Sequence, residues 1–195
     1  MRREIKIVGL VIGIIFTSTT AFSKSSVDKR FSVGTNLVEY LDLVTTNLEV
    51  GANLNRYWSI HLKGSYNPFW WFFKKDETTY PFQHCQLSGE LITKYWPWYV
   101  YSGWHIKGGF KYLVYNKGGV FSPKTEEGIG FGAILGGGYA LMLNKWWNIE
   151  FGVALFGGYK KYKEYSSPRC GKLLATKEHL FISPDGVSIS FHFTF

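Results

Sequence analysis

Polar and apolar residues alternate along most of the chain. In Asn47–Leu54 the even-numbered residues are apolar and the odd-numbered ones are polar or glycine, and Trp58–Tyr66 repeats this pattern closely. Such a two-residue period places alternate side chains on opposite faces of a β-strand. After the N-terminal region, no segment sustains a helical period or an apolar run long enough to cross a membrane as a helix. The pattern therefore predicts an all-β fold.

Eight segments show this alternation, and Gly, Asn, Pro and charged residues separate them. An even number of antiparallel strands returns both ends of the sheet to one side, as closed bacterial barrels require. We therefore expect a closed antiparallel transmembrane β-barrel of about eight strands, with up-and-down topology, in one domain over residues 24–195. The predicted strands are Phe31–Val38, Asn47–Leu54, Trp58–Tyr66, Phe82–Tyr95, Trp104–Tyr115, Gly128–Met142, Trp146–Tyr159 and Val187–Phe195.

The connections between these strands alternate in length. Tight turns are expected at Asn55–Tyr57, Trp96–Val100 and Leu143–Lys145. Long charged loops are expected at Asn67–Pro81, Asn116–Glu127 and Lys160–Gly186, with a shorter loop near Glu39–Thr46. Short turns at one end and long loops at the other are typical of the periplasmic and extracellular ends of outer-membrane barrels.

The orientation of the two faces decides between a membrane barrel and a soluble sandwich or lipocalin-like barrel, whose apolar residues point inward. Amphipathic indole rings favour the headgroup layer, and we predict a membrane girdle of Trp58, Trp96, Trp98, Trp146 and Trp147. The last strand ends with Phe191, Phe193 and Phe195 in alternation, which looks like the signal read by the outer-membrane barrel-assembly machinery. Both features favour the membrane orientation.

Charged residues of both signs lie on the polar faces of the predicted strands. Facing lipid near the midplane, each would cost roughly 2–4 kcal/mol, so we expect them to point inward. An eight-stranded barrel is just wide enough to be filled by side chains, and an ion network there would leave no open pore. The predicted lumen network is Glu49, Lys63, Glu90, Lys107, Lys111 and Glu150.

The N-terminus has the features of a signal peptide. Arg2, Arg3 and Lys6 precede the apolar run Ile7–Phe16, and Ala21-Phe22-Ser23 resembles a cleavage site. The run is about half the length that a transmembrane anchor, the alternative, would need. We therefore predict a signal peptide over residues 1–23 and a location in the outer membrane.

The composition of the chain limits the classes of molecule that it is expected to bind. The formal charge of +8 falls to about +6 once the signal peptide, with three basic residues and one acidic residue, is removed. Scattered lysines without a nucleic-acid motif favour outer-membrane lipid and lipopolysaccharide phosphate as partners and argue against nucleic acid. Aromatic residues make up 19% of the chain, more than a core of this size requires, and a membrane interface explains the excess.

Candidate chemistry is sparse, and we predict no catalytic, cofactor or metal site. A pair such as Glu90 and Glu150 could act as acid and base, but a structural ion network is the favoured interpretation. The alternative function is a lipid-A-modifying hydrolase or acyltransferase, with His84 or His179 and a serine in the last loop as candidates. No nucleophile lies in a recognisable motif with either histidine. The two loop serines are Ser166 and Ser167.

Two further features fall near the predicted extracellular rim. Cys85 and Cys170 are the two cysteines, and in an oxidising compartment they are expected to form one disulfide, the alternative being two free thiols. The aromatic run Phe69–Phe73, followed by Lys74 and Lys75, is either an adhesive patch or a segment lying in the headgroup layer. We favour the second interpretation.

Several short motifs are distributed along the chain after the predicted signal peptide: Thr35-Asn36-Leu37, Asn47–Gly51, Arg56–Ser59, Tyr66–Phe69, Gly138-Tyr139, Lys145–Glu150, Cys170-Gly171 and Pro184–Phe195. Together they resemble one family of small outer-membrane barrels, a domain of unknown function in fermentative Gram-negative gut and oral bacteria. The resemblance covers most of the chain after the signal peptide, but its motifs are structural and bring no catalytic residues.

This resemblance implies a barrel. Because members are often encoded near fimbrial genes, it also implies by association a role in the biogenesis or anchoring of fimbriae or another surface structure. We therefore expect a non-enzymatic surface barrel whose loops bind a partner such as a fimbrial or surface protein. The aromatic Phe69–Phe73 segment departs from the family pattern.

Overall fold

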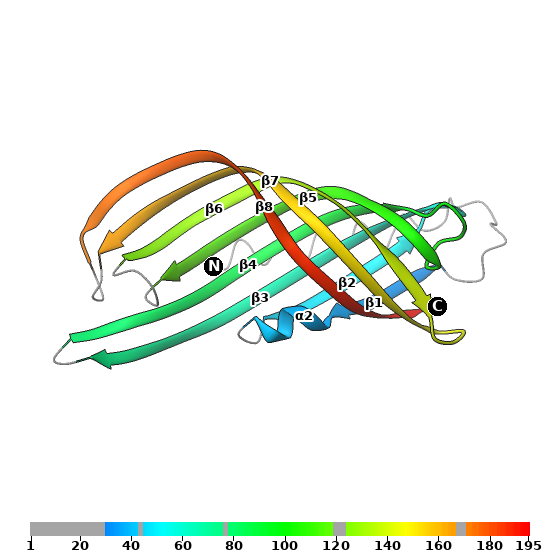
Figure 1. Ribbon diagram of the computed structural model, residues 1–195, viewed down its shortest axis with the longest axis horizontal. Coiled ribbons are helices and arrows are strands. Elements are labelled where there is room, and N and C mark those ends of the chain that lie inside the picture. Colours follow the sequence, from blue (N-terminus) through cyan, green and yellow to red (C-terminus); the bar gives the residue numbers. More distant parts are fainter. Residues whose placement is uncertain (1–29, 43–44, 76–77, 119–123, 167–170) are drawn as a thin grey trace, which may run out of the picture.

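Eight antiparallel strands form a closed barrel in which each strand pairs with its neighbour in sequence and the last pairs with the first. This computed structural model describes residues 30–42, 45–75, 78–118, 124–166 and 171–195, with side chains described outside residues 70–81. The predicted signal peptide therefore lies outside the described residues. The predicted fold class, an up-and-down antiparallel barrel, is confirmed (Figure 1).

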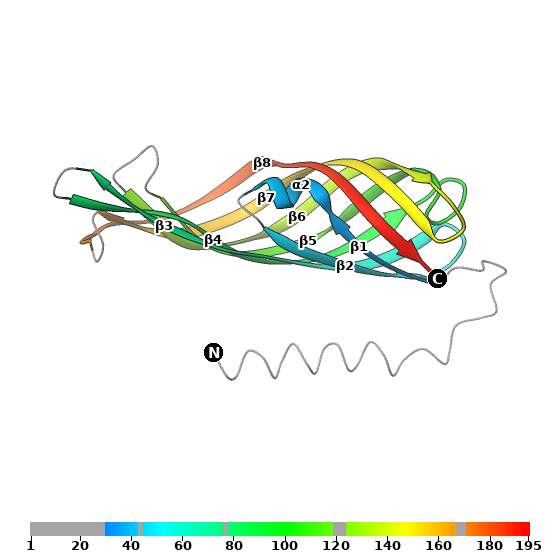
Figure 2. The same ribbon diagram turned by 90° about the horizontal axis from the view of Figure 1, so that it is seen from below.

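The strands differ greatly in length. Three hairpins extend well beyond the first two strands, at the end of the barrel opposite the C-terminus (Figures 1 and 2). The elements are β1 (Phe31–Asn36), α2 (Leu37–Leu41), β2 (Thr46–Asn53), β3 (Trp58–Lys75), β4 (Thr78–Tyr95), β5 (Gly103–Gly118), β6 (Lys124–Met142), β7 (Trp147–Ser166) and β8 (Leu173–Thr194).

Alternation in the sequence becomes alternation in burial. On β7, the even-numbered residues from Asn148 to Phe156 are buried, whereas odd-numbered ones such as Phe151 and Val153 are exposed. The same pattern on β5 buries His105 and exposes Trp104. Polar and charged side chains therefore occupy much of the interior, and large apolar side chains cover the outside.

Two of the expected loops are largely strand. The segment expected as a loop over Asn67–Pro81 continues β3 to Lys75 and begins β4 at Thr78. The segment expected over Lys160–Gly186 extends β7 to Ser166 and begins β8 at Leu173. These predictions were wrong because charged residues do not interrupt a strand: residues that pair in register satisfy their backbone groups whether or not they are apolar.

The first connection also differs from the prediction, because the chain turns into helix α2 at Leu37 instead of continuing as strand to Val38. Asn36 caps this helix: its side-chain oxygen accepts a hydrogen bond from the Val38 N–H at 3.1 Å. In the described part of the chain, no helix has the length and apolar character needed to cross a bilayer.

Because β1 and β2 are short, the barrel wall is lower on that side. β1 pairs with β8 only from Ser190 to Thr194, and β2 pairs with β3 only as far as Tyr66. Among the described residues, no strand pairs with this side of β8 from Leu173 to Ile189, or with this side of β3 beyond Tyr66. Helix α2 contacts β8 at the base of this gap (Figure 2).

A β-bulge in β8 changes which residues point inward. Ala154 pairs with Gly186 but the next residue, Leu155, pairs with Pro184, so Asp185 is the extra residue. Gly186 has a φ of 114°, a conformation that side-chain-bearing residues rarely adopt. The residues of β8 that point inward are therefore even-numbered between the bulge and the C-terminus but odd-numbered before the bulge. One of these odd-numbered residues, Phe181, packs against Phe156 with ring centroids 4.9 Å apart.

Candidate functional site

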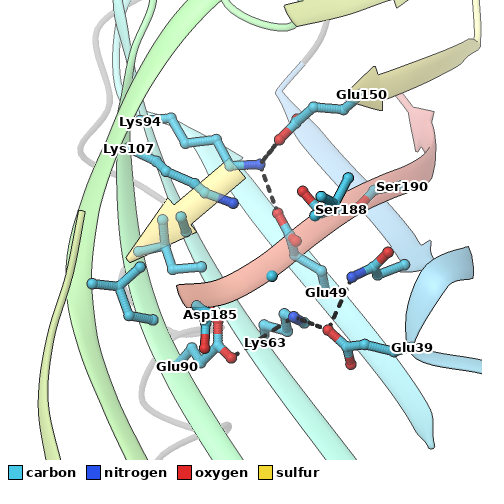
Figure 3. A pocket seen from close by; sticks show the side chains of 16 residues that line it. Glu39, Glu49, Lys63, Glu90, Lys94, Lys107, Glu150, Asp185, Ser188 and Ser190 are labelled. Carbon is cyan, nitrogen blue, oxygen red and sulfur yellow. Dashed lines mark hydrogen bonds and ion pairs between the residues drawn. The ribbon is translucent and has the colours of Figure 1, made fainter. Parts of the chain in front are cut away.

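The centre of the lumen holds a lysine between two carboxylates. Lys94 Nζ lies 2.9 Å from Glu49 Oε1 and 2.8 Å from Glu150 Oε1 (Figure 3). These three buried residues come from β4, β2 and β7, respectively. Charges removed from water are tolerated where they are paired and hydrogen-bonded, so this triad joins distant strands through the interior.

Three buried histidines surround the same carboxylates. His61 Nδ1 lies 2.8 Å from Glu49 Oε1, and His105 Nε2 lies 3.2 Å from Glu150 Oε1. The ring of His192 is farther away, with Nε2 3.9 Å from the other Glu150 oxygen. Among the described residues, no group of His, Cys, Asp and Glu is arranged to hold a metal ion. The cluster is thus a dense ion network around Lys94.

A second group of charges lies towards the long-strand end. Lys111 Nζ lies 2.9 Å from Glu90 Oε1 and 2.6 Å from the Oδ1 of Asp185, the bulge residue. Lys63 contacts Glu39 of α2 and lies 3.7 Å from Glu90. Glu39 also accepts a hydrogen bond from Ser65 Oγ at 2.8 Å. Helix α2 thereby covers this part of the lumen with a charged residue.

The structure brings five of the six predicted network residues into ion pairs: Glu49, Lys63, Glu90, Lys111 and Glu150. The sixth, Lys107, lines the same cavity (Figure 3) but makes no ion pair with any described carboxylate. Sequence reasoning missed Lys94. This residue lies an even number of positions after Glu90 on the same strand, so alternation places both side chains on the inner face and could have identified it. Sequence reasoning also missed Glu39 and Asp185, which reach the lumen only through a helix and a bulge.

The space left inside the network is small. A cavity of about 30 Å³ lies among Glu49, Lys63, Glu90, Lys94 and Lys107. A volume of this size holds at most two or three water molecules, since each needs roughly 10–15 Å³ on this measure. An organic substrate has no room there, which favours a structural role for the network over acid–base catalysis by Glu90 and Glu150.

The turn between β4 and β5 folds into the barrel and closes the short-turn end. Trp96 is fully buried, and its Nε1–H donates to Ser59 Oγ at 2.9 Å. It packs with Val100, Tyr101 and Ala140. The backbone oxygen of Tyr101 accepts a hydrogen bond from Asn148 Nδ2 at 3.1 Å. The phenol of Tyr101 is also buried, which raises its pKa to about 12. We refer to Trp96, Val100 and Tyr101 as the plug.

Trp96 therefore does not belong to the predicted girdle. The prediction was wrong for this residue because it took closeness to a strand end as exposure, whereas Trp96 continues the inward parity of Lys94 and its N–H finds a buried partner. Trp98 and Trp104 are exposed around the same end, and so are Trp58, Trp146 and Trp147. The stacked rings of Trp147 and Phe191 have centroids 4.7 Å apart.

The terminal strand completes the outer surface at this end. Phe193 stacks on Trp146, with ring centroids 6.0 Å apart, and Phe195 contacts Phe31 at the same spacing. The Phe195 N–H donates to the Phe31 oxygen at 2.9 Å, which closes the barrel between β8 and β1. The predicted assembly-signal residues Phe191, Phe193 and Phe195 thus lie on the outward face of the closing strand.

An uncharged band encircles the outside of the barrel. On β7 the outward positions are uncharged from Trp147 to Tyr159, and Lys161 is the first charge. These thirteen residues cover a height of about 28 Å, at about 3.3 Å per residue and a tilt of about 45°. Outward positions are also uncharged up to Pro68 on β3, from Cys85 on β4, up to Val114 on β5 and from Ile129 on β6.

Above the ion network, the inner face of the long strands forms a concave site that we call the cup. Its volume is about 250 Å³. Lys160 Nζ lies 4.0 Å from the centroid of the Phe181 ring, and Tyr162 packs edge-on against His179 at 5.6 Å. Sequence reasoning missed the cup because five of its residues lie in segments expected to be loops. The lining residues are Leu113, Tyr115, Lys117, Glu126, Lys160, Tyr162 and His179.

The residues considered for lipid-A chemistry are not assembled into a catalytic group among the described residues. His84 Nε2 lies 3.1 Å from Asp42 Oδ2, whereas His179 packs against Tyr162. Ser166 Oγ accepts a hydrogen bond from the backbone N–H of Lys172 at 3.0 Å. Ser167 lies outside the described residues. No described serine is in hydrogen-bond contact with His84 or His179, as a nucleophile and its base require.

The predicted disulfide and the aromatic segment Phe69–Phe73 both lie near the rim, and the structure describes each of them only in part. Cys85 carries a free thiol 3.5 Å from the Phe69 backbone oxygen, so the predicted disulfide is not supported, and Cys170 lies outside the described residues. Phe69 packs against Phe82 with centroids 5.6 Å apart. The side chains from Trp70 to Lys75 also lie outside what the structure describes, and the choice between the two interpretations of this segment stays open.

Comparison with known proteins identifies a family. The family model described as "Protein of unknown function (DUF3575)" matches residues 10–195, which is nearly the whole chain. The chain therefore belongs to this family. A search of curated proteins finds no match. The family description carries no activity.

Proposed function

We propose that this member of a family without an assigned activity is a non-enzymatic outer-membrane β-barrel whose extracellular end binds a partner at the cell surface. The observation that carries the proposal is the uncharged outward band, whose height on β7 matches the apolar band of about 25 Å on outer-membrane barrels. Tryptophans at the short-turn end supply the aromatic belt that such proteins place at the interface.

The interior supports binding over transport. The plug fills one end of the lumen, the Lys94 network fills the middle, and α2 with Glu39 covers part of the other end. Between them the described residues enclose a cavity of about 30 Å³, in keeping with a barrel of eight strands that side chains fill. By contrast, the cup is open and lies in the long-strand extension, where bacterial barrels carry their extracellular segments.

The finer role that we propose is the biogenesis or anchoring of fimbriae or another surface structure. The extension supports this role, because its paired strands hold the cup on a rigid scaffold, as a binding site requires. A lipid-A-modifying enzyme is the competing function. Comparing lipid A by mass spectrometry in deletion and parent strains separates the two. We expect an unchanged acyl pattern, and a changed pattern restored by the gene would favour the enzyme.

Location and orientation can be tested in intact cells with two matched cysteine variants in a Cys85→Ser, Cys170→Ser background. Lys163→Cys lies on the exposed face of the extension and Lys145→Cys lies in a tight turn at the opposite end. A membrane-impermeant maleimide should label position 163 in intact cells and position 145 only after the outer membrane is permeabilised. Equal labelling of both positions in intact cells, or of neither after permeabilisation, would contradict the proposal.

A further inference from the structure

The cup lies at the upper edge of the uncharged band. On β7 the uncharged outward stripe ends at Tyr159, and Lys161 is the first charged residue on the outer face. The alternate residues Lys160 and Tyr162 point into the cup. On β5 the last apolar outward residue is Val114, with the polar Asn116 beyond it, and the neighbouring Tyr115 and Lys117 point inward into the cup. In a barrel placed in the membrane by this band, the cup therefore lies at the level of the outer-leaflet head groups.

Two lysines of the cup lack the carboxylate partners that other lysines of the extension have. Lys161 lies 2.5 Å from Glu178, and Lys177 lies 2.6 Å from Glu164. Among the described residues, Lys117 and Lys160 have no carboxylate oxygen within 4.0 Å, and Glu126 is the one acidic residue in the wall of the cup. Two ammonium groups without a carboxylate partner on one concave surface favour a ligand that carries negative charge.

The shape and the remaining lining residues restrict the ligand further. The cup holds about 250 Å³, close to the lower limit of roughly 300 Å³ for small-molecule sites. Tyr115, Tyr162 and His179 supply ring faces and polar atoms around the two lysines. These features suit a phosphorylated sugar, which presents a phosphate to the ammonium groups and a ring to the aromatic side chains.

The gap beside β8 gives such a ligand a route from the membrane. β8 has no strand on its open side from Leu173 to Ile189 among the described residues. On its outer face, Leu180 and Ile182 are 81% and 83% exposed, because no neighbouring strand covers them. An amphiphile could keep its acyl chains against these residues while its head group reaches around the edge of β8 into the cup.

We infer that the cup binds the phosphate-bearing sugar head group of an outer-leaflet glycolipid, held by Lys117 and Lys160 and entering beside the open edge of β8. The inference rests on the proposed outer-membrane function and specifies one ligand of the extracellular end. Lysine binds phosphate as a point charge, and basic pockets at the membrane surface recognise lipid head groups in this way.

The test uses the full barrel in nanodiscs, with binding measured by native mass spectrometry and titration. The probes are bis-phosphorylated lipid A, the same lipid A after phosphatase treatment, and soluble glucosamine 1-phosphate. We expect the phosphorylated lipid to bind at least tenfold more tightly than either of the other probes. Equal binding of the dephosphorylated lipid would overturn the phosphate site. Equal binding of the soluble sugar phosphate would overturn the membrane source of the ligand.

Variants locate the site. Lys117→Gln with Lys160→Gln should weaken phosphorylated lipid A binding at least tenfold, while Lys161→Gln with Lys163→Gln, which removes the same number of charges from the outer face of β7, should leave it unchanged. Equal effects of the two would overturn the assignment. The comparison of probes needs no variant, so it stands even if the double substitution impairs folding. Normal surface labelling at position 163 with no preference for phosphorylated lipid would refute the inference and leave the proposed function intact.

Discussion

Lys94 Nζ lies 2.8 Å from Glu150 Oε1, which links β4 to β7 through the interior of the barrel. The same ammonium group lies 2.9 Å from Glu49 on β2. A single lysine thus compensates two buried carboxylates from strands that are not neighbours in the sheet. The ion network holds the middle of the lumen together in the place where a soluble barrel would have an apolar core.

Removing this lysine should destabilise the barrel strongly. Lys94→Met leaves Glu49 and Glu150 buried without their lysine partner, and breaking a buried ion pair in this way lowers the free energy of unfolding by about 3–5 kcal/mol. The measurement is the free energy of unfolding by urea of the barrel in lipid vesicles. Lys163→Met, on the exposed outer face of β7, is the control and should change stability by less than about 0.5 kcal/mol. A similar small loss for both variants would show that the network does not stabilise the barrel.

The plug makes a separate prediction about two tryptophans of the same turn. Trp96 is fully buried, whereas Trp98 is 66% exposed. Trp96→Ala should lower the free energy of unfolding by about 3–5 kcal/mol, because it leaves a cavity beside Ser59 and Tyr101. Trp98→Ala should cost much less. Urea unfolding of the two variants checks this, and equal losses would argue that Trp96 lies at the membrane interface instead of inside the barrel.

Much of this architecture could be predicted from the sequence because β-strands have a fixed side-chain period. The number of strands, their order and the inward positions of Glu49 and Glu150 all follow from alternation. The period also predicts the inward position of Trp96, but the expectation that strand-end tryptophans face the interface outweighed it. In such conflicts the sequence does not show whether an indole N–H will find a buried partner, as Trp96 does at Ser59.

Other features depend on contacts that alternation cannot reveal. Helix α2 begins because Asn36 caps it, and Asp185 reaches Lys111 because a bulge adds one residue to β8. The bulge also moves His179 and Phe181 to the inner face, so the cup could not be predicted without its position. The strands are longer than predicted because exposed paired strands carry charges, such as Lys161 and Glu178, that otherwise mark loops.

The bulge can be tested through its glycine. Gly186 has a φ of 114°, and a Cβ added there would meet no atom within 4 Å. Gly186→Ala should therefore destabilise the barrel through backbone strain alone, by about 1–3 kcal/mol. Gly64→Ala is the control, since its Cβ would also enter open space but its backbone is not in the positive-φ region. Equal stability of the two variants in urea unfolding would contradict a bulge at this position.

The outer band predicts that one substitution has different effects at two exposed leucines. Leu135 lies in the band and is 64% exposed, whereas Leu174 lies in the extension beyond it and is 50% exposed. Leu135→Lys should lower the free energy of unfolding by urea in lipid vesicles by about 2–4 kcal/mol, because the charge must enter hydrocarbon. Leu174→Lys should be nearly neutral, since it faces water. If both leucines tolerate lysine equally, the band does not contact lipid.

The central claim is that apolar residues face lipid while the ionic residues fill the lumen, and β7 tests it most directly. Nitroxide spin labels are placed one at a time at Phe151, Val153 and Leu155, which point outward, and at Gly152 and Ala154, which point inward. In vesicles, we predict that collision with dissolved oxygen is frequent at the three outward positions and rare at the two inward ones, while a water-soluble nickel complex reaches none of the five. Ready access of the nickel complex to Phe151, Val153 and Leu155 would place the outer face in water and contradict the account.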